Sequence, residues 1–298
     1  MNNLYFYSKV IYLLLARRLV SSHIVREDYD RLSVSYDHYF AEHMAKHARR
    51  LVTQLGLRPG NRVLDLATGT GNLALALAEA VSSQGEVTGV DQSAGMLAKA
   101  EEKRIQTGYR QLRFVQGDMH NSLLSYPDNS FDAITCGWAI GYGNPSLLVK
   151  TMHRKLKPGG KLGLIENARD TLAPIHMASL KVAQTMPRHL QQIMDLHRHL
   201  PRHKLQLQDW FESANLRTMS LWEGREEFSF ASGADVLNWV LHTGASAGFD
   251  RMMAPELKTR CDELFIKYIE ASAPQNSRII VEHHYVAGIA QKETLPCI

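Results

Sequence analysis

Cysteine is scarce in this sequence. Only Cys136, Cys261 and Cys297 occur among 298 residues, and they are widely spaced. Three distant cysteines form neither a disulfide framework nor the paired spacing of a zinc site. The composition therefore excludes the small disulfide-stapled domains, and it predicts a reducing, cytoplasmic compartment and no bound metal.

A long uninterrupted apolar run is also missing. Residues 4–20 come nearest, but Lys9, Arg17 and Arg18 interrupt them, and the run falls short of the roughly 20 residues that span a bilayer. Its positive charges mostly follow the apolar core, the reverse of a signal peptide. A helix this apolar must be covered. We expect docking on its own domain or on a second copy in a homo-oligomer, with peripheral membrane contact as the alternative.

Aromatic residues are absent from the most basic part of the chain. Between Ile175 and Lys204 there are five lysines and arginines but only one acidic residue, Asp195. This excess of four positive charges (five minus one) equals the net charge of +4 for the whole chain. Such a stretch is either a solvated face or a site for an anionic group of a substrate. Without interleaved aromatic side chains it does not favour nucleic acid as a partner.

The most informative stretch runs from Val63 to Ala74. It begins as a short apolar run ending in Asp65, which is typical of a strand buried on both faces of a parallel sheet. Gly69 and Gly71 then allow a tight turn and a close approach to a ligand. A helical pattern follows from Asn72. Strand, glycine turn and helix N-terminus together predict a cradle for a nucleotide-like ligand.

Four more strands follow with informative endings. They are expected at Val87–Asp91, Leu112–Gln116 (followed by Gly117-Asp118), Phe131–Cys136 and in the stretch from Leu156 through Pro158-Gly159-Gly160 to Leu162. In this order the endings resemble the class I methyltransferases that use S-adenosylmethionine, over residues 30–170. The resemblance implies an α/β fold with a Rossmann-like seven-stranded sheet, the last strand antiparallel. The chain would divide into N-terminal helices (1–55), the cofactor-binding core (56–170), a helical lid insertion (171–207) and the remaining sheet with the substrate pocket (208–298).

The resemblance also implies how S-adenosylmethionine would be held. Asp65 and the Gly69–Gly71 backbone would serve the methionine tail, Asp91 the ribose hydroxyls, and Asp118 with Met119 the adenine. Any one of these acids could instead be a helix cap. The complete set of expected cofactor contacts is Tyr36, Asp65, Ala67, Gly69, Gly71, Asp91, Gln92, Met96, Asp118, Met119 and Cys136.

The methyl acceptor is less clearly encoded. The first motif is similar to that of the ubiquinone/menaquinone C-methyltransferases, but Trp138–Tyr142 replaces their Phe-Gly-Leu-Arg-Asn type of run and lacks its arginine. Aromatic walls beside a basic lid fit a small lipophilic substrate with an anionic head, and C-methylation of a prenyl diphosphate, as in terpenoid secondary metabolism, is the first specific hypothesis. The alternatives are C- or O-methylation of a quinone-type or other natural-product ring, then an RNA methyltransferase or a non-catalytic cofactor-binding protein.

The residues expected to act on the acceptor come from the strand ends and the lid. Between Pro187 and Pro201 we expect a helix whose apolar stripe at residues 190, 193 and 194 continues to His197, while His199 and His203 face solvent or an anion. The candidate bases are Glu166, His197 and Tyr142. The candidate substrate contacts are Trp138, Tyr142, Arg188 and Arg198.

Overall fold

The computed structural model describes residues 2–194, 199–247, 251–274 and 277–294. The chain forms two compact units. The helical unit comprises residues 1–39, 170–198 and 225–284, and the sheet unit comprises residues 40–169, 199–224 and 285–298. The lid and C-terminal segments expected from the sequence each contribute residues to both units. His197 and Arg198 lie outside the described residues.

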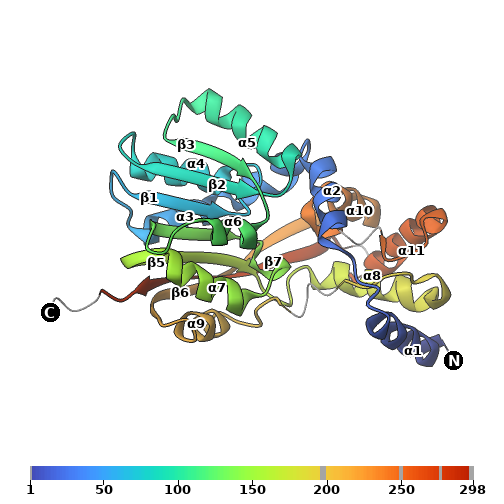
Figure 1. The fold of residues 1–298 in the computed structure, drawn as a ribbon. Helices are drawn as coiled ribbons and strands as arrows, with labels where there is room; N and C mark the ends of the chain where they lie inside the picture. Colours follow the sequence, from blue (N-terminus) through green and yellow to red (C-terminus); the bar gives the residue numbers. More distant parts are fainter. Residues whose placement is uncertain (1, 195–198, 248–250, 275–276, 295–298) are drawn as a thin grey trace. The chain divides into compact units, whose positions relative to one another are not determined.

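A seven-stranded sheet of order β3-β2-β1-β4-β5-β7-β6 organises the fold (Figure 1). Strands β1 to β5 are parallel, and β7 runs antiparallel to β5, which confirms the predicted topology. The strand bounds are β1 Arg62–Leu66, β2 Glu86–Asp91, β3 Leu112–Gln116, β4 Phe131–Gly137, β5 Leu156–Asn167, β6 Leu216–Phe230 and β7 Ile279–Lys292.

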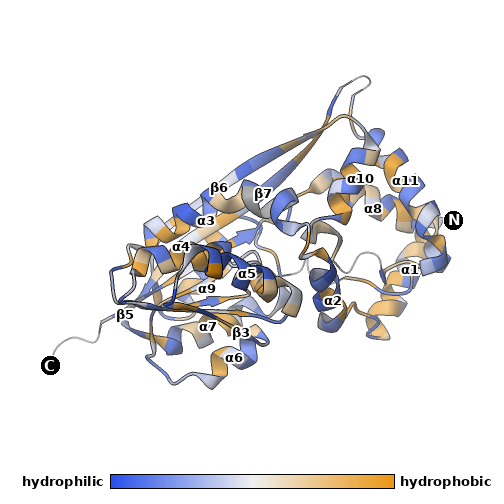
Figure 2. Ribbon diagram, turned by 90° about the horizontal axis from the view of Figure 1, so that it is seen from above, coloured by the Kyte–Doolittle hydropathy of each residue, from blue (hydrophilic) through white to orange (hydrophobic). Residues whose placement is uncertain are grey.

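Helices cover both faces of the parallel strands, because alternate residues of each buried strand need apolar partners on each side. Figure 2 shows α3 and α4 on one face and α6 and α7 on the other. The helices of the sheet unit are α3 Glu42–Leu55, α4 Asn72–Val81, α5 Ala94–Thr107, α6 Met119–Ser125, η2 Ile140–Tyr142, α7 Pro145–Lys155 and α9 Leu205–Glu212.

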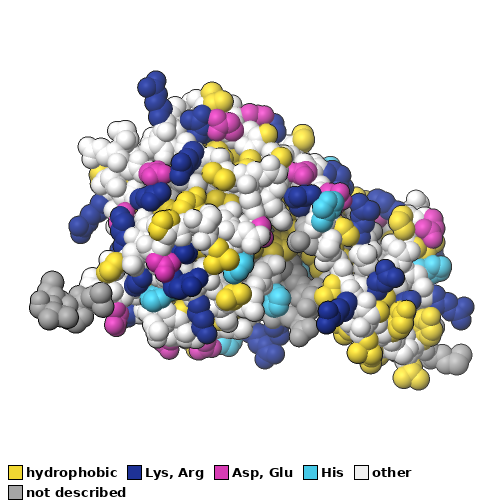
Figure 3. All heavy atoms as spheres, in the orientation of Figure 1, with side chains coloured by type: hydrophobic (Ala, Val, Ile, Leu, Met, Phe, Trp, Pro, Cys, Tyr) yellow, Lys and Arg dark blue, Asp and Glu magenta, His cyan; other side chains and the backbone are white. Residues whose placement is uncertain are grey.

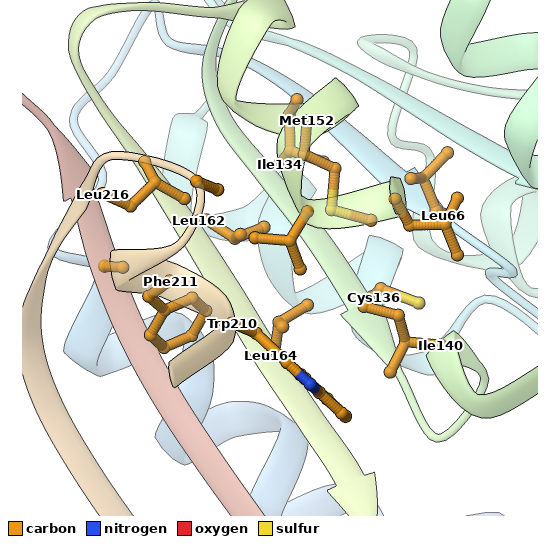
Figure 4. Close-up of a cluster of buried hydrophobic side chains, with 14 of the residues drawn as sticks. Leu66, Ile134, Cys136, Ile140, Met152, Leu162, Leu164, Trp210, Phe211 and Leu216 are labelled. Atoms are coloured by element: carbon orange, nitrogen blue, oxygen red, sulfur yellow. The ribbon is translucent and has the colours of Figure 1, made fainter. Parts of the chain in front are cut away.

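One cluster of buried apolar side chains lies between the central strands and helices α7 and α9. Figure 4 shows Met152 of α7 and the rings of Trp210 and Phe211 of α9 packed against Leu162 and Leu164 of β5. All five side chains are at least nine-tenths buried. At roughly 2 kcal/mol for each large apolar side chain removed from water, this layer fixes the carboxyl ends of β4 and β5 in place.

The helical unit is built from short helices and loops, together with the end of β6 (residues 225–230) and the start of β7 (residues 279–284). Its elements are α1 Asn2–Leu15, α2 Ser22–Leu32, α8 Ala173–Thr185, η3 Pro187–His189, α10 Gly233–Leu241, η5 Gly244–Ser246, η7 Pro255–Leu257 and α11 Lys258–Glu270. The five-residue π-helix η1, Asp37–Ala41, leads from this unit into α3.

The helix predicted between Pro187 and Pro201 is wrong for its described part. After the single turn of η3, Leu190 forms a β-bridge with Met253 and Ile193 forms one with Leu19. Backbone pairing with two segments distant in sequence therefore outweighs the local helical spacing of these apolar residues.

Helix α1 is apolar on two sides. Phe6 and Leu13 are buried against Ala183 and Leu190, whereas Leu4 and Leu15 are each about 80% exposed. Figure 3 shows hydrophobic side chains gathered on the surface over α1. Among the described residues, no helix combines the length and apolar character that crossing a bilayer requires.

Candidate functional site

The candidate cofactor site lies where the strand order of the sheet reverses. Strand β1 is flanked by β2 on one side and β4 on the other, and ligands of open α/β sheets bind beyond the carboxyl ends of the strands at such a point. The register sets Asp65 beside Thr135 and Leu66 beside Cys136. Side chains from β1 and β4 thereby meet at one edge of the sheet.

The turn after β1 has a left-handed backbone at three residues, one alanine and the two glycines for which a tight turn was predicted. The φ angles of Ala67, Gly69 and Gly71 are 53°, 55° and 81°. A Cβ on Gly71 would lie 3.0 Å from Ala100 Cβ and Phe114 Cζ, so this glycine allows close packing onto α5 and β3. A Cβ on Gly69 would meet nothing within 4 Å, so this glycine borders open space where a ligand can approach.

Asp65 is a buried carboxylate at the end of β1. It accepts hydrogen bonds from the hydroxyls of Thr68 and Thr135, both at 2.6 Å, and the residue is only 1% exposed. Burial raises the pKa of Asp65 from 3.8 to about 6, although the two hydroxyls act in the opposite direction. A nearby cation would lower this pKa and hold the carboxylate ionised.

Asp91 braces the glycine turn from the end of β2. One of its oxygens accepts the backbone N–H of Gly69 at 2.8 Å, and the other accepts that of Ser93 at 2.9 Å. Each carboxylate oxygen can accept more than one hydrogen bond. The same group can therefore hold the turn and still accept bonds from a vicinal diol.

Asp118 is a helix cap. Its Oδ1 accepts the backbone N–H groups of His120 and Asn121 at 3.0 and 2.9 Å, at the N-terminus of α6. The capping alternative left open by the sequence thus holds for this acid. Its exposure also leaves it available for a ligand contact, so the expected role at adenine stays a prediction.

The remaining expected cofactor contacts occupy different environments. Met96 is 2% exposed within α5, whereas Met119 is half-buried against the central core. The backbone carbonyl of half-buried Gln92 accepts a bond from Gln116. Tyr36 belongs to the helical unit, where its ring packs edge-on to Tyr29 at 6.1 Å.

Negative charge gathers at these strand ends. Burial raises the pKa of the Cys136 thiol well above its usual value, and the carboxylates of Glu166, Asp65 and Asp91 raise it further. Three carboxylates close enough to act on one thiol create a negative potential. This arrangement fits a cationic ligand, and S-adenosylmethionine carries both a sulfonium and an ammonium group.

Glu166 supports the loop that follows β4. Its Oε2 accepts the backbone N–H of Gly141 at 3.0 Å, and its Oε1 accepts that of Asn167 at 2.8 Å. Burial raises the pKa of Glu166 from 4.5 to about 7. Nδ1 of His199 lies 3.2 Å from the carbonyl oxygen of Gly141, so both sides of one residue are engaged. His199 therefore contacts a backbone carbonyl, where the sequence predicted that it faces solvent or an anion.

Two buried polar atoms flank this loop without a hydrogen-bond partner in the described part of the chain. They are Nε1 of Trp138, a donor, and Oδ1 of Asn167, an acceptor. Trp138 holds a left-handed φ of 52° while its backbone N–H donates to Ile165 at 2.7 Å. Tyr142 packs half-buried against the central core. Sequence reasoning missed Asn167, because a polar residue after a strand is ordinary in a loop.

The expected basic lid is only partly described. Arg188 lies in η3 of the helical unit, while His197 and Arg198 fall outside the described residues. Among the described residues, no group of three histidine, cysteine, aspartate or glutamate side chains is arranged to hold a metal ion.

The sequence profile of the ubiE/COQ5 methyltransferase family matches residues 19–197, more than half of the chain. The chain belongs to the ubiE/COQ5 methyltransferase family. Membership of this family confirms the methyltransferase resemblance, and with it the S-adenosylmethionine cofactor, that the strand endings predicted.

Two relatives illustrate the similarity within this family. The chain is 38% identical over 126 residues to a ubiquinone/menaquinone biosynthesis C-methyltransferase of Coxiella burnetii, covering 42% of this chain and 50% of the relative. It is 37% identical over 153 residues to a demethylmenaquinone methyltransferase of Symbiobacterium thermophilum, covering 49% and 59%. The chain thus spans between half and three-fifths of the length of these curated relatives.

Solved structures share the fold of this ubiE/COQ5 family member. The YcgJ protein of Bacillus subtilis matches with a TM-score of 0.55 at 20% identity, over 84% of this chain and 100% of its own. The [4+2]-cyclase SpnF matches with a TM-score of 0.51 at 19% identity, over 84% and 81%. Because a cyclase has this fold, the fold alone does not set the reaction.

Proposed function

We propose that this ubiE/COQ5 family member methylates a ring carbon of a hydroquinone-type substrate. The proposal draws on the two curated relatives, whose names specify C-methylation in quinone biosynthesis and demethylmenaquinone. From the sequence alone this reaction was the alternative to methylation of a prenyl diphosphate, because the arginine of the quinone enzymes is missing after β4. The relatives now favour it over methylation of a prenyl diphosphate.

The observation that carries the proposal is the pair of polar atoms beside the Trp138–Tyr142 loop. A hydroquinone carries oxygens that both donate and accept hydrogen bonds, held on a flat apolar ring. The indole N–H of Trp138 can donate to one such oxygen, and Oδ1 of Asn167 can accept from a hydroxyl. A buried polar atom without a hydrogen bond costs free energy, so a ligand that hydrogen-bonds to both atoms would bind more tightly than one that does not.

The chain must also take a proton from the acceptor. When bound, S-adenosylmethionine supplies an electrophilic methyl group. A phenolic hydroxyl that loses its proton makes its ring carbons more nucleophilic, and a base close to the ring would assist. Tyr142 and His199 are the candidates at the loop surface. Glu166 is buried and bonded to backbone N–H groups, which suits it to positioning the loop.

The prenyl diphosphate hypothesis has less support. The arginines expected to bind its phosphates are Arg188, in the helical unit, and Arg198, outside the described residues. The three carboxylates near Cys136 would also repel a dianionic group. A neutral hydroquinone ring avoids that repulsion.

The test supplies methyl-labelled S-adenosylmethionine with either a chemically reduced demethylnaphthoquinone or geranyl diphosphate. We expect label on the ring carbon of the reduced quinone, and label in geranyl diphosphate alone would overturn the proposal. Trp138→Phe, which removes only the N–H, should raise KM for the hydroquinone about tenfold. Trp222→Phe is the matched control, because its buried Nε1 likewise lacks a partner among the described residues but lies on β6.

A further inference from the structure

The helical unit encloses a cavity of about 830 Å³, within the range of about 300–1,000 Å³ that small-molecule sites occupy. All of its lining residues belong to the helical unit. Its walls come from α1, α8, α10 and α11 together with the loop around Met252, and Figure 2 shows hydrophobic residues along these helices. Representative wall residues are Phe6, Val10, Ile175, Leu237, Val240 and Phe265.

Methionine is prominent in the lining. Met177, Met194, Met252 and Met253 all border the cavity. Their unbranched, polarisable side chains adapt to ligands of irregular shape. Water in such a space finds few hydrogen-bond partners, so an apolar ligand is the favoured occupant.

The charged side chains in the lining already have partners of opposite sign. Arg31 bonds to Asp28 at 3.1 Å, and Lys258 lies 3.1 Å from Asp262. Arg251 lies 3.9 Å from Glu27. Each cation of the lining therefore faces a carboxylate, and the cavity does not call for an anionic ligand.

The cavity opens to the surface along α1 and α8. Tyr7 and Met177 border it and are 58% and 52% exposed. Leu14 and Leu180 also border it and are exposed. An entrance with apolar side chains lets a flexible hydrocarbon chain enter without crossing a charged rim.

We propose that this cavity binds one neutral, flexible apolar chain, isoprenoid or alkyl. The inference goes beyond the proposed function, because it depends only on residues of the helical unit and needs neither the methyl donor nor methyl transfer. The bound hydrocarbon chain can be part of a free lipid or the side chain of the methyl acceptor.

Cys261 is a built-in reporter, since it lines the cavity and is partly exposed, whereas Cys136 is fully buried. The full chain, with Cys297→Ser, is treated with N-ethylmaleimide with and without geranylgeraniol, and modification is followed by peptide mass spectrometry. We expect geranylgeraniol to slow modification of Cys261 at least tenfold. An unchanged rate at saturating geranylgeraniol would overturn the proposal.

Calorimetry of the same protein, without S-adenosylmethionine, should give one geranylgeraniol per chain. Ser179→Phe, which fills the cavity from α8, should weaken binding at least tenfold. If that variant misfolds, Ala245→Phe tests the same expectation by filling the cavity from another wall. Ser83→Phe in an exposed turn of the sheet unit is the matched control and should bind normally. Binding that survives in a folded cavity-filling variant contradicts the proposal.

Competition distinguishes the two sources of the chain. If a naphthoquinone with an isoprenoid side chain displaces geranylgeraniol and a naphthoquinone without one does not, the bound hydrocarbon chain belongs to the methyl acceptor. Geranylgeraniol binding that neither compound affects assigns it to a separate lipid. Binding without hydroquinone methylation would contradict only the proposed function, and methylation without binding would contradict only the cavity assignment.

Discussion

The buried carboxylate of Glu166 accepts a hydrogen bond from the backbone N–H of Gly141 at 3.0 Å. This bond joins the end of β5 to the loop after β4, the loop that carries Trp138 and Tyr142. The loop that we assign to the acceptor is therefore held by a group whose pKa burial raises to about 7. Ionisation of this group near neutral pH should be visible in stability.

The first prediction concerns the pH dependence of stability. Because burial raises the pKa of Glu166 in the folded state, its contribution to the free energy of unfolding is greatest below pH 4.5 and is lost as the pH rises through about 7. Glu166→Gln cannot ionise. Between pH 5 and pH 8 the free energy of unfolding of the wild type should therefore decrease by about 2–3 kcal/mol more than that of Glu166→Gln.

Urea unfolding at several pH values measures this difference. Glu256→Gln removes an exposed carboxylate and serves as the control, for which the pH dependence should match the wild type. Parallel pH profiles for wild type and Glu166→Gln would show that Glu166 is not the group responsible.

The second prediction concerns cofactor affinity. The pKa of Asp65 is about 6, and the ammonium group of S-adenosylmethionine would favour its ionised form. Affinity should then increase about tenfold from pH 5 to pH 7, with proton release on binding near pH 5. Calorimetry in two buffers of different ionisation enthalpy detects those protons. Asp65→Asn should bind at least tenfold more weakly, with no pH dependence over this range.

The third prediction compares two alanine substitutions in the same turn. Gly69→Ala meets no atom within 4 Å and should cost only the backbone strain of its φ of 55°, about 1–2 kcal/mol, while cofactor affinity falls at least tenfold. Gly71→Ala adds crowding against Ala100 and Phe114 to its φ of 81°, so it should lower the melting temperature further. Equal affinities of Gly69→Ala and wild type would contradict the placement of a ligand at Gly69.

The fourth prediction concerns the outer face of α1. We propose that a second copy of the chain covers Leu4, Ile11 and Leu15, which are 81%, 57% and 80% exposed. Ile11→Lys with Leu15→Lys should convert an oligomer to a monomer in light scattering, with methyl transfer retained. Ile105→Lys, an exposed apolar residue on α5, is the control. A wild-type monomer that pellets with lipid vesicles would instead support the membrane alternative.

Much of the candidate cofactor site was predictable because its signals are local. A buried strand, two glycines and a helix start follow one another within Val63–Ala74, and each residue type acts through its own backbone or burial preference. The ends of β2 and β3 are recognisable in the same way. The positions of Asp65, Asp91 and Asp118 at successive strand ends thus follow from the residue pattern alone.

Long-range pairing explains what was not predictable. Thr135 donates to Asp65 from 70 residues away, and His199 meets Gly141 across 58 residues. The apolar spacing at Leu190 and Ile193 fitted a helix, but bridges to Met253 and Leu19 determine their conformation. No local pattern encodes a partner that far along the chain.

The sequence by itself determined the family, the cofactor and the acids at the strand ends, since these depend on residue types in short stretches. Only the tertiary structure decided that Glu166 is buried and bonded to the Trp138–Tyr142 loop, and that the helical unit contains a cavity. It also decided that Trp138 and Asn167 each carry a buried polar atom with no hydrogen-bond partner among the described residues. Burial and charge pairing arise when distant segments pack together, and so they can be read only from the folded chain.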